Sequence, residues 1–223
     1  MIELFQITGS ASFAARAALE EAGAEYLTVD VHPRRRDETP ALALVNPLEQ
    51  VPSVRDGEVV VYETSAVLQY VAERFPAAGL APPPGDPLRG AYLRWMAWLG
   101  NTLHSAWQPL NIPSSISDDP AAHESIGRKG RRKLESIGAY LETELAGTDW
   151  CLGDRYSVAD IYLYMLVGWQ SYVEGGYVLG GEAVAAHYHR VGARPAIARA
   201  RELDDLDERL ERHHPKLRGG KPI

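Results

Sequence analysis

Residues 51–65 read VPSVRDGEVVVYETS and join a hairpin signal to the start of a helix. Two short valine-containing runs flank Arg55-Asp56-Gly57, and an Asp-Gly pair between apolar runs is typical of a tight β-hairpin. The polar residues 63–65 favour a helix start, and apolar residues then recur at helical spacing up to Phe75. Because a helix start exposes unpaired backbone N–H groups, this segment can hold a carboxylate.

Pro52 opens the first strand of this hairpin, where its ring removes a ladder donor. A cis bond between Val51 and Pro52 would turn the main chain of Val51 outward, where a ligand could pair with it. The hairpin is therefore a candidate binding element as well as a structural one.

The Val-Pro pair, the hairpin and the helix start at Glu63 together resemble the glutathione-binding half of the glutathione S-transferase family. That family has a cis Val-Pro, a hairpin and then Glu or Gln followed by Ser; here Thr64 stands in the place of the serine. The resemblance implies that Val51 pairs through its backbone with the cysteinyl part of glutathione, within a segment that includes Gln50 and Pro52. It also implies that Glu63 and Thr64 hold the γ-glutamyl end. An ordinary hairpin followed by a capped helix is the alternative.

The composition restricts the class of protein. The chain has 223 residues, 45% of them hydrophobic and 24% charged, which is typical of a soluble globular protein. Its net charge of -7 argues against nucleic acid as a partner. We expect no membrane association and a cytoplasmic location, since no apolar run approaches membrane-spanning length and no leader pattern precedes the first strand. The single cysteine, Cys151, excludes an internal disulfide framework and a cysteine-rich metal site, and we expect no bound metal.

The chain divides at a segment rich in proline and glycine. Strand, helix and strand patterns over residues 2–31 predict a parallel β-α-β unit, and the hairpin completes the order of a thioredoxin-like domain. We therefore predict a fold of α/β plus all-α class, with a thioredoxin-like glutathione-binding domain at 1–77 and a linker at 78–87. An all-helical domain with an electrophile pocket is predicted at 88–223.

The loop before the first helix is the expected place of the chemistry, because a helix N-terminus stabilises a thiolate. The loop reads Thr-Gly-Ser-Ala-Ser over residues 8–12 and holds no Tyr or Cys. By the family resemblance, Ala11 falls where bacterial beta-type members carry their reactive cysteine. We therefore expect Ser10 first, and Ser12 second, to donate a hydrogen bond to the glutathione sulfur and lower its pKa. The alternative is that both serines only cap the helix.

The first long helix of the second half carries a polar face beside its apolar one. By the resemblance, the corresponding helix lines the cleft between the domains. His104 would then face the thiol end of glutathione as a catalytic residue, with Asn101, Trp107 and Gln108 as the wall of the second substrate's pocket. A polar strip that faces water or a partner subunit is the alternative reading.

A capping box is expected at Ser157, with Asp160 three residues later; its role in the family is in folding. As a whole, the chain resembles a glutathione S-transferase similar to bacterial beta-type members but without the cysteine. The resemblance implies that glutathione, as co-substrate, attacks a small hydrophobic electrophile in a detoxification reaction, and that the protein is a homodimer. Two alternatives stay open: a glutathione-dependent isomerase or dehalogenase, and a non-catalytic binding or regulatory protein on the same fold.

Overall fold

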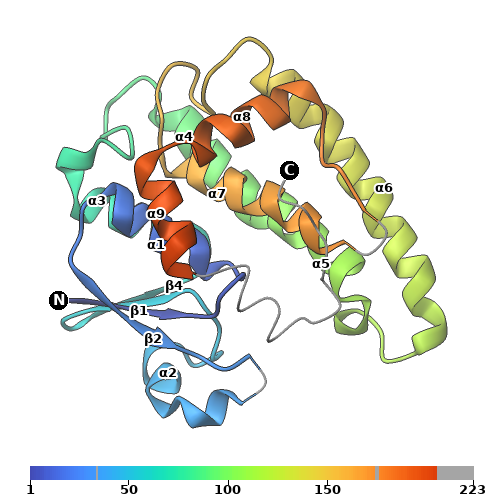
Figure 1. Ribbon diagram of the computed structural model, residues 1–223, viewed down its shortest axis with the longest axis horizontal. Helices are drawn as coiled ribbons and strands as arrows, with labels where there is room; N and C mark the ends of the chain where they lie inside the picture. The colour runs from blue at the N-terminus through green and yellow to red at the C-terminus, as the bar shows by residue number, and fades with distance from the viewer. Residues whose placement is uncertain (34, 174–175, 205–223) are drawn as a thin grey trace. The chain divides into compact units, whose positions relative to one another are not determined.

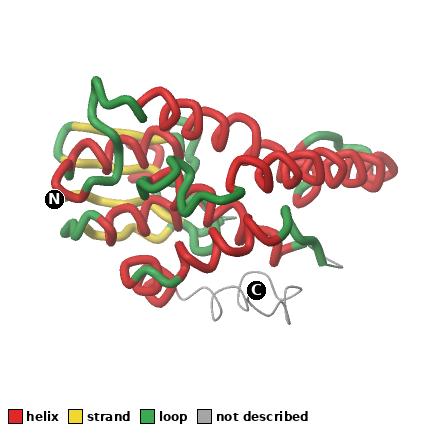
Figure 2. Tube along the Cα trace, turned by 90° about the horizontal axis from the view of Figure 1, so that it is seen from above, coloured by secondary structure: helices red, strands yellow, loops and turns green. Residues whose placement is uncertain are grey.

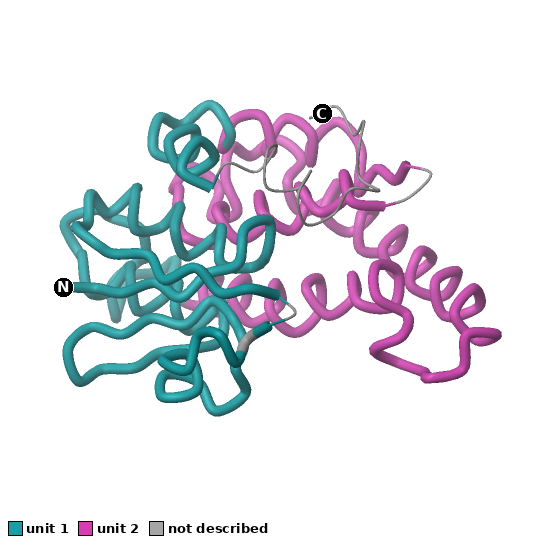
Figure 3. The backbone as a smooth tube through the Cα atoms, turned by 60° about the horizontal axis from the view of Figure 1, so that its bottom comes forward, with its two compact units in different colours: residues 1–89, 192–216 teal, residues 90–191, 217–223 magenta. Residues whose placement is uncertain are grey.

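The computed structural model describes the chain except for residues 34, 174–175 and 205–223 (Figure 1). It consists of two compact units (Figure 3). Unit 1 contains Met1–Arg89 together with a segment that begins at Gly192, and unit 2 contains Gly90–Val191. The end of the all-helical domain predicted at 88–223 lies outside the described residues.

Unit 1 is built on a four-stranded sheet, which confirms the thioredoxin-like prediction. Its strands are β1 (Ile2–Gln6), β2 (Tyr26–Asp30), β3 (Ser53–Asp56) and β4 (Val59–Tyr62), in the spatial order β2-β1-β3-β4. β1 pairs with β2 in parallel and with β3 antiparallel, and β3 pairs with β4 as the expected hairpin. Gly57 lies in the turn of the hairpin with a φ of 62°, a backbone angle that residues with a Cβ rarely adopt.

Helices cover both faces of this sheet. α1 (Ser12–Glu21) and α3 (Thr64–Arg74) lie on one side, and α2 (Pro40–Val45) lies on the other (Figure 1). The alanines of α1 are fully buried, so that the helix packs closely. On the α2 side, the buried core consists of Phe5, Val31, Leu42 and Val45. Short 3-10 turns lie at Arg36–Glu38 and Pro76–Ala78.

The last described helix, α9 (Pro195–Asp204), belongs to unit 1, whereas the sequence-based division put it in the second domain. It packs beside α1. Arg194, just before α9, donates two hydrogen bonds to the carboxylate of Glu21 at 2.5 and 2.8 Å. Arg199 donates to Glu20 at 2.9 Å. These ion pairs between distant segments leave no local signal in the sequence, which explains the difference.

Unit 2 is helical, as predicted, and all the strands of the described chain lie in unit 1 (Figure 2). Its longest helices are α4 (Arg89–Trp98), α6 (Pro120–Leu145), α7 (Val158–Gly168) and α8 (Glu182–Gly192). The shorter segments are α5 (Ser105–Asn111), a π-helical segment (Leu99–His104), and 3-10 turns at Pro113–Ser115 and Trp169–Tyr172. α5 packs against α6 at Gly130, where an added Cβ would lie 2.9 Å from the backbone nitrogen of Leu110.

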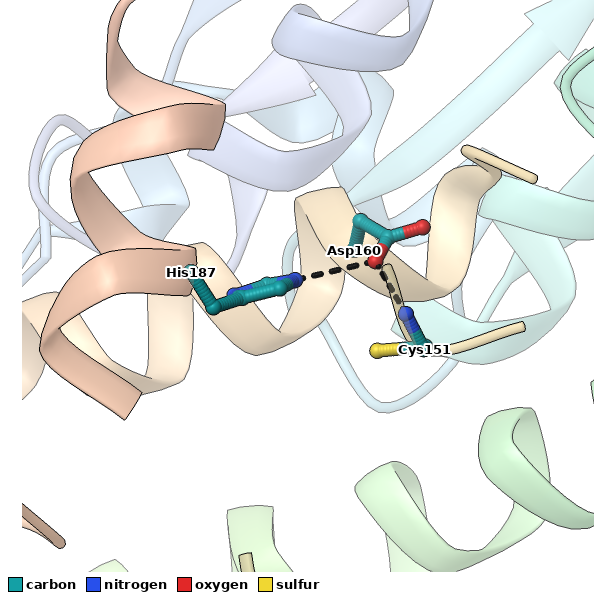
Figure 4. A group of neighbouring side chains, drawn as sticks. All are labelled: Cys151, Asp160 and His187. Carbon is teal, nitrogen blue, oxygen red and sulfur yellow. Dashed lines mark hydrogen bonds and ion pairs between the residues drawn. The ribbon is translucent and has the colours of Figure 1, made fainter. Parts of the chain in front are cut away.

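The centre of unit 2 is α7, which is buried from Val158 to Val167. Its start carries the predicted capping box: Ser157 and Asp160 exchange side-chain-to-backbone hydrogen bonds. Asp160 also accepts hydrogen bonds from the backbone N–H of Cys151 at 2.7 Å and from Nε2 of His187 at 2.9 Å (Figure 4). Both carboxylate oxygens therefore have protein donors, and the cluster ties α8 and the segment before α7 to the helix start.

Cys151 lies in this cluster as a buried free thiol. Burial and the neighbouring Asp160 carboxylate raise the pKa of Cys151 well above its ordinary value. The thiol is thus held in its neutral, poorly nucleophilic form, as expected for a structural cysteine. Among the described residues, no helix is both long and apolar enough to cross a membrane.

Candidate functional site

The register of the sheet brings three chain segments to one end of unit 1. Phe5 of β1 pairs with Ser53 of β3, and Ser53 pairs with Tyr62 of β4. The loop that follows β1, the Pro52 turn that precedes β3, and Glu63 after β4 therefore lie at the same end. α1 and α3 both begin at this end, because each follows one of these strands. Two helix N-termini at one edge favour an anionic ligand there.

The turn before β3 contains the cis bond between Val51 and Pro52 that the family resemblance implies. Two buried polar side chains hold the turn through the carbonyl of Gln50. It accepts hydrogen bonds from Nδ2 of Asn46 at 3.0 Å and from Oγ of Ser53 at 2.7 Å. Val51 is half-buried and packs on the core around Phe5 and Val45, whereas the side chain of Gln50 is exposed.

Asn46 and Ser53 were not among the predicted site residues. Asn46 also accepts a hydrogen bond from the backbone N–H of Leu48 at 2.9 Å. Its side-chain amide therefore bonds the backbone at both Leu48 and Gln50, in the segment that leads to Pro52. The signal available in the sequence was an Asn-Pro pair, Asn46-Pro47, which favours turns.

Glu63 has an unusual backbone, with a φ of 71°. For a residue other than glycine, this left-handed region costs about 1–3 kcal/mol, so the surrounding structure must hold it there. Glu63 occupies the N-cap position of α3 without a capping hydrogen bond from its side chain, and that side chain is exposed. Thr64 follows as the buried first residue of the helix. The carboxylate of Glu63 is therefore available to a ligand at the helix start.

Ser10 and Ser12 form one hydrogen-bonded group in the loop before α1. Their hydroxyl oxygens lie 2.8 Å apart. Both are within hydrogen-bond distance of the carbonyl of Ile7, Ser10 at 2.6 Å and Ser12 at 2.8 Å. The hydroxyl of Ser12 also accepts from the backbone N–H of Ile7 at 3.0 Å. Because each hydroxyl has one proton, only some of these bonds exist at once.

The two serines differ in exposure. Ser12 has no exposed surface, whereas Ser10 is half-buried. Neither is the N-cap residue of α1, which is Ala11. The hydroxyl of Ser10 nevertheless lies 3.2 Å from the backbone nitrogen of Ser12, the first residue of the helix, and accepts a hydrogen bond from its N–H. The hydroxyl of Ser10 is therefore the one that a ligand can reach, and the buried hydroxyl of Ser12 forms a hydrogen bond with it.

In unit 2, His104 ends the π-helical segment. Its Nδ1 lies 2.8 Å from the hydroxyl of Tyr162, and the edge of its ring meets Trp169 with centroids 4.9 Å apart. Burial lowers the pKa of His104 to about 4. The imidazole is therefore neutral at neutral pH, and one of its nitrogens is committed to Tyr162. A π-helical turn inside an α-helical run is frequent at functional positions.

The predicted substrate-binding residues of unit 2 do not share one environment. Asn101, in the π-helical segment, and Gln108, on α5, are exposed. Trp107 is 1% exposed, and its Nε1 has no hydrogen-bond partner among the described residues. The ring of Trp107 meets the ring of Tyr177 edge-on at 5.9 Å between centroids. Trp107 is thus part of the packed interior as well as a neighbour of the His104 turn.

Comparison with known proteins points to one family. The family model for the glutathione S-transferase N-terminal domain matches residues 1–73, and that for the C-terminal domain matches residues 106–195. The chain is 28% identical to glutathione S-transferase GstA of Escherichia coli O157:H7 over 208 residues, covering 92% of this chain and 100% of that protein.

Solved structures agree. A sphingomonad glutathione S-transferase complexed with glutathione matches with a TM-score of 0.78 and 32% identity, over 92% of this chain and 99% of the other. The bacterial beta-class glutathione S-transferase of Sphingomonas chungbukensis matches with a TM-score of 0.78 and 29% identity, with the same coverage.

Proposed function

This chain belongs to the glutathione S-transferase family, and we propose that it ionises the thiol of glutathione beside Ser10 and directs the thiolate at a small hydrophobic electrophile. The observation that carries this proposal is the meeting of the Ser10 loop, the cis Val51-Pro52 turn and Glu63 at one end of the sheet. The glutathione bound in the sphingomonad relative supports glutathione as the co-substrate.

The γ-glutamyl end and the central cysteinyl part of glutathione each have a matching group in unit 1. The γ-glutamyl end carries an ammonium and a carboxylate. We assign the ammonium to the exposed carboxylate of Glu63, and the carboxylate to the N–H groups at the start of α3, beside Thr64. The cysteinyl backbone is assigned to Val51, in the turn that Gln50 and Pro52 complete.

The serine pair supplies a way to ionise the thiol. If Ser12 donates its proton to the carbonyl of Ile7, the proton of Ser10 is free to point at the glutathione sulfur. A hydrogen bond to a charged group contributes about 1.5–3 kcal/mol, which corresponds to roughly one to two pKa units on the thiol. The thiol proton leaves to solvent, and the thiolate then forms a bond to carbon while the leaving group departs with its electron pair.

We assign His104 a hydrogen bond to the electrophile rather than a proton transfer. Burial keeps the imidazole neutral, and Nδ1 is engaged by Tyr162, so Nε2 is the nitrogen left for a hydrogen bond. We place Asn101, Trp107 and Gln108 beside it as the wall for the electrophile.

In line with the family resemblance, we also propose that the protein is a cytoplasmic homodimer with a role in detoxification. Size-exclusion chromatography with light scattering tests whether the protein is a dimer.

The test is conjugation of glutathione to an activated aryl halide by the parent protein, Ser10→Ala and Ser171→Ala. Ser171 is a matched control, because its exposed hydroxyl bonds only locally, to the carbonyl of Gly168. We expect Ser10→Ala to lower kcat by about tenfold to a hundredfold and Ser171→Ala to leave it unchanged. A parent protein that binds glutathione but conjugates none of several electrophiles would instead indicate the binding-protein alternative.

A further inference from the structure

A buried carboxylate from the last described helix reaches the loop that carries Ser10. Asp204 ends α9 and has no exposed surface. Its Oδ2 accepts a hydrogen bond from the backbone N–H of Gly9 at 3.1 Å, across 195 residues of sequence. Gly9 has a φ of 72° and directly precedes Ser10. Asp204 therefore contacts the loop at the residue where the chain turns toward the candidate catalytic hydroxyl.

A buried cation accompanies this carboxylate. Arg16 of α1 is 4% exposed, and its Nε lies 3.6 Å from Oδ1 of Asp204. Its Nη2 donates to Oε1 of Gln6, at the end of β1, at 2.5 Å. Gln6 in turn donates from Nε2 to Asp30 at 2.7 Å. The same polar network thus holds the loop at its base, through Gln6, and at its tip, through Gly9.

We propose that Asp204 is a positioning residue for Ser10: by fixing the amide of Gly9 it sets the direction of the Ser10 hydroxyl, and Arg16 keeps Asp204 in place. This inference rests on the proposed role of Ser10. Asp204 has no exposed surface, so in this proposal it acts through Gly9 and not by contact with a ligand. The segment that contains α9 would then be required for the geometry of a glutathione site whose other proposed residues in unit 1 lie in the first 64 positions.

The fold offers a contrast that separates positioning from simple stabilisation. Arg194 and Arg199 also tie the α9 segment to α1, through Glu21 and Glu20. Neither of these ion pairs involves the Ser10 loop. The hydrogen bond of Asp204, by contrast, reaches the loop backbone at Gly9. Arg194→Gln is therefore a matched control that weakens the α9–α1 contact without touching the loop.

The first measurement uses the protein without ligand. We expect Asp204→Asn to increase the rate of amide hydrogen exchange in residues 7–12 by about tenfold, because the loop loses the charged acceptor that fixes it. Exchange in α3 should stay unchanged, and Arg194→Gln should leave the loop at the parent rate. If Asp204→Asn does not fold, Arg16→Lys carries the same test, since it keeps the charge but loses the fork that joins Asp204 to Gln6.

The second measurement uses glutathione conjugation. We expect Asp204→Asn to lower kcat by about tenfold, to leave KM for glutathione within about twofold, and to raise the pKa seen in the pH–rate profile. In the double variant Ser10→Ala/Asp204→Asn, kcat should fall no further than in Ser10→Ala, because Asp204 acts through Ser10.

The outcomes separate the two proposals. Loop exchange unchanged in Asp204→Asn, additive losses in the double variant, or an equal loss of kcat in Arg194→Gln would each overturn the positioning role. A parent protein that binds no glutathione would overturn the proposed function. Faster amide exchange of the loop in ligand-free Asp204→Asn would, even then, support the conclusion that Asp204 fixes the backbone at Gly9.

Discussion

The hydroxyl of Tyr162 lies 2.8 Å from Nδ1 of His104 and joins α7 to the π-helical turn. This contact fixes the ring of a histidine that burial keeps neutral, with a pKa of about 4. The imidazole is therefore held in one orientation by the hydroxyl of Tyr162 and the ring of Trp169, without carrying a charge. It also makes the stability of the protein depend on pH.

The first prediction concerns this pH dependence. The pKa of His104 is about 4 in the folded protein and 6.5 in an ordinary setting, so only the unfolded chain gains its proton as the pH falls between these values. The free energy of unfolding should therefore fall across this window, by about 2 kcal/mol at about pH 5, through this residue alone. Urea unfolding of the parent and of His104→Gln near pH 7.5 and near pH 5 measures the difference.

The matched control for that experiment is His189→Gln, because His189 is an exposed histidine of the same unit. We expect the control to lose stability between the two pH values as the parent does, and His104→Gln to lose less. An equal loss in the parent and in His104→Gln would contradict the burial of a neutral imidazole at this position.

The second prediction concerns Ser12, which bonds both the N–H and the carbonyl of Ile7 and has no exposed surface. Ser12→Ala should lower the free energy of unfolding by about 1–3 kcal/mol, since it leaves the backbone N–H of Ile7 without the hydroxyl that accepts its hydrogen bond. Ser10→Ala should cost less stability, because Ser10 is half-buried, but it should raise the pKa of bound glutathione more. Urea unfolding measures the free energy of unfolding of each variant, and the ultraviolet absorbance of the thiolate measures the pKa of bound glutathione. A larger loss of stability in Ser10→Ala, together with a larger rise of the thiol pKa in Ser12→Ala, would exchange the roles of the two serines.

The third prediction concerns Asp160. Asp160→Asn replaces an acceptor-only carboxylate that receives hydrogen bonds from Ser157, Cys151 and His187. An amide nitrogen in place of one oxygen would face a donor, so we expect a loss of about 2–4 kcal/mol in the free energy of unfolding. Asp154→Asn, in the same loop region but exposed, should cost less than about 0.5 kcal/mol. Equal effects of the two variants would show that the buried network contributes little.

Local sequence signals predicted much of the fold and part of the site. Val51-Pro52, the Asp56-Gly57 turn and the Ser157 box each act within a few residues, so their patterns could be read directly. The gathering of Ser10, Pro52 and Glu63 at one sheet end could be anticipated only through resemblance to a family, because it depends on strand register.

The remaining features depend on contacts between distant residues. Tyr162 is 58 residues from His104, and Asp204 is 195 residues from Gly9, and neither pair has a local pattern. Burial also decided two roles that residue type could not. It made His104 neutral, and it placed Ser12 beneath the surface while it left Ser10 accessible.

The most direct test of the account is the thermal midpoint with and without millimolar glutathione, for the parent and for Glu63→Gly. Glycine tolerates the φ of 71° at this position, so the variant removes the carboxylate without adding backbone strain. A ligand that binds only the folded state raises the midpoint by mass action. We predict a clear upward shift for the parent and a shift near zero for Glu63→Gly. No shift for the parent, or equal shifts for both proteins, would contradict glutathione binding at this end of the sheet.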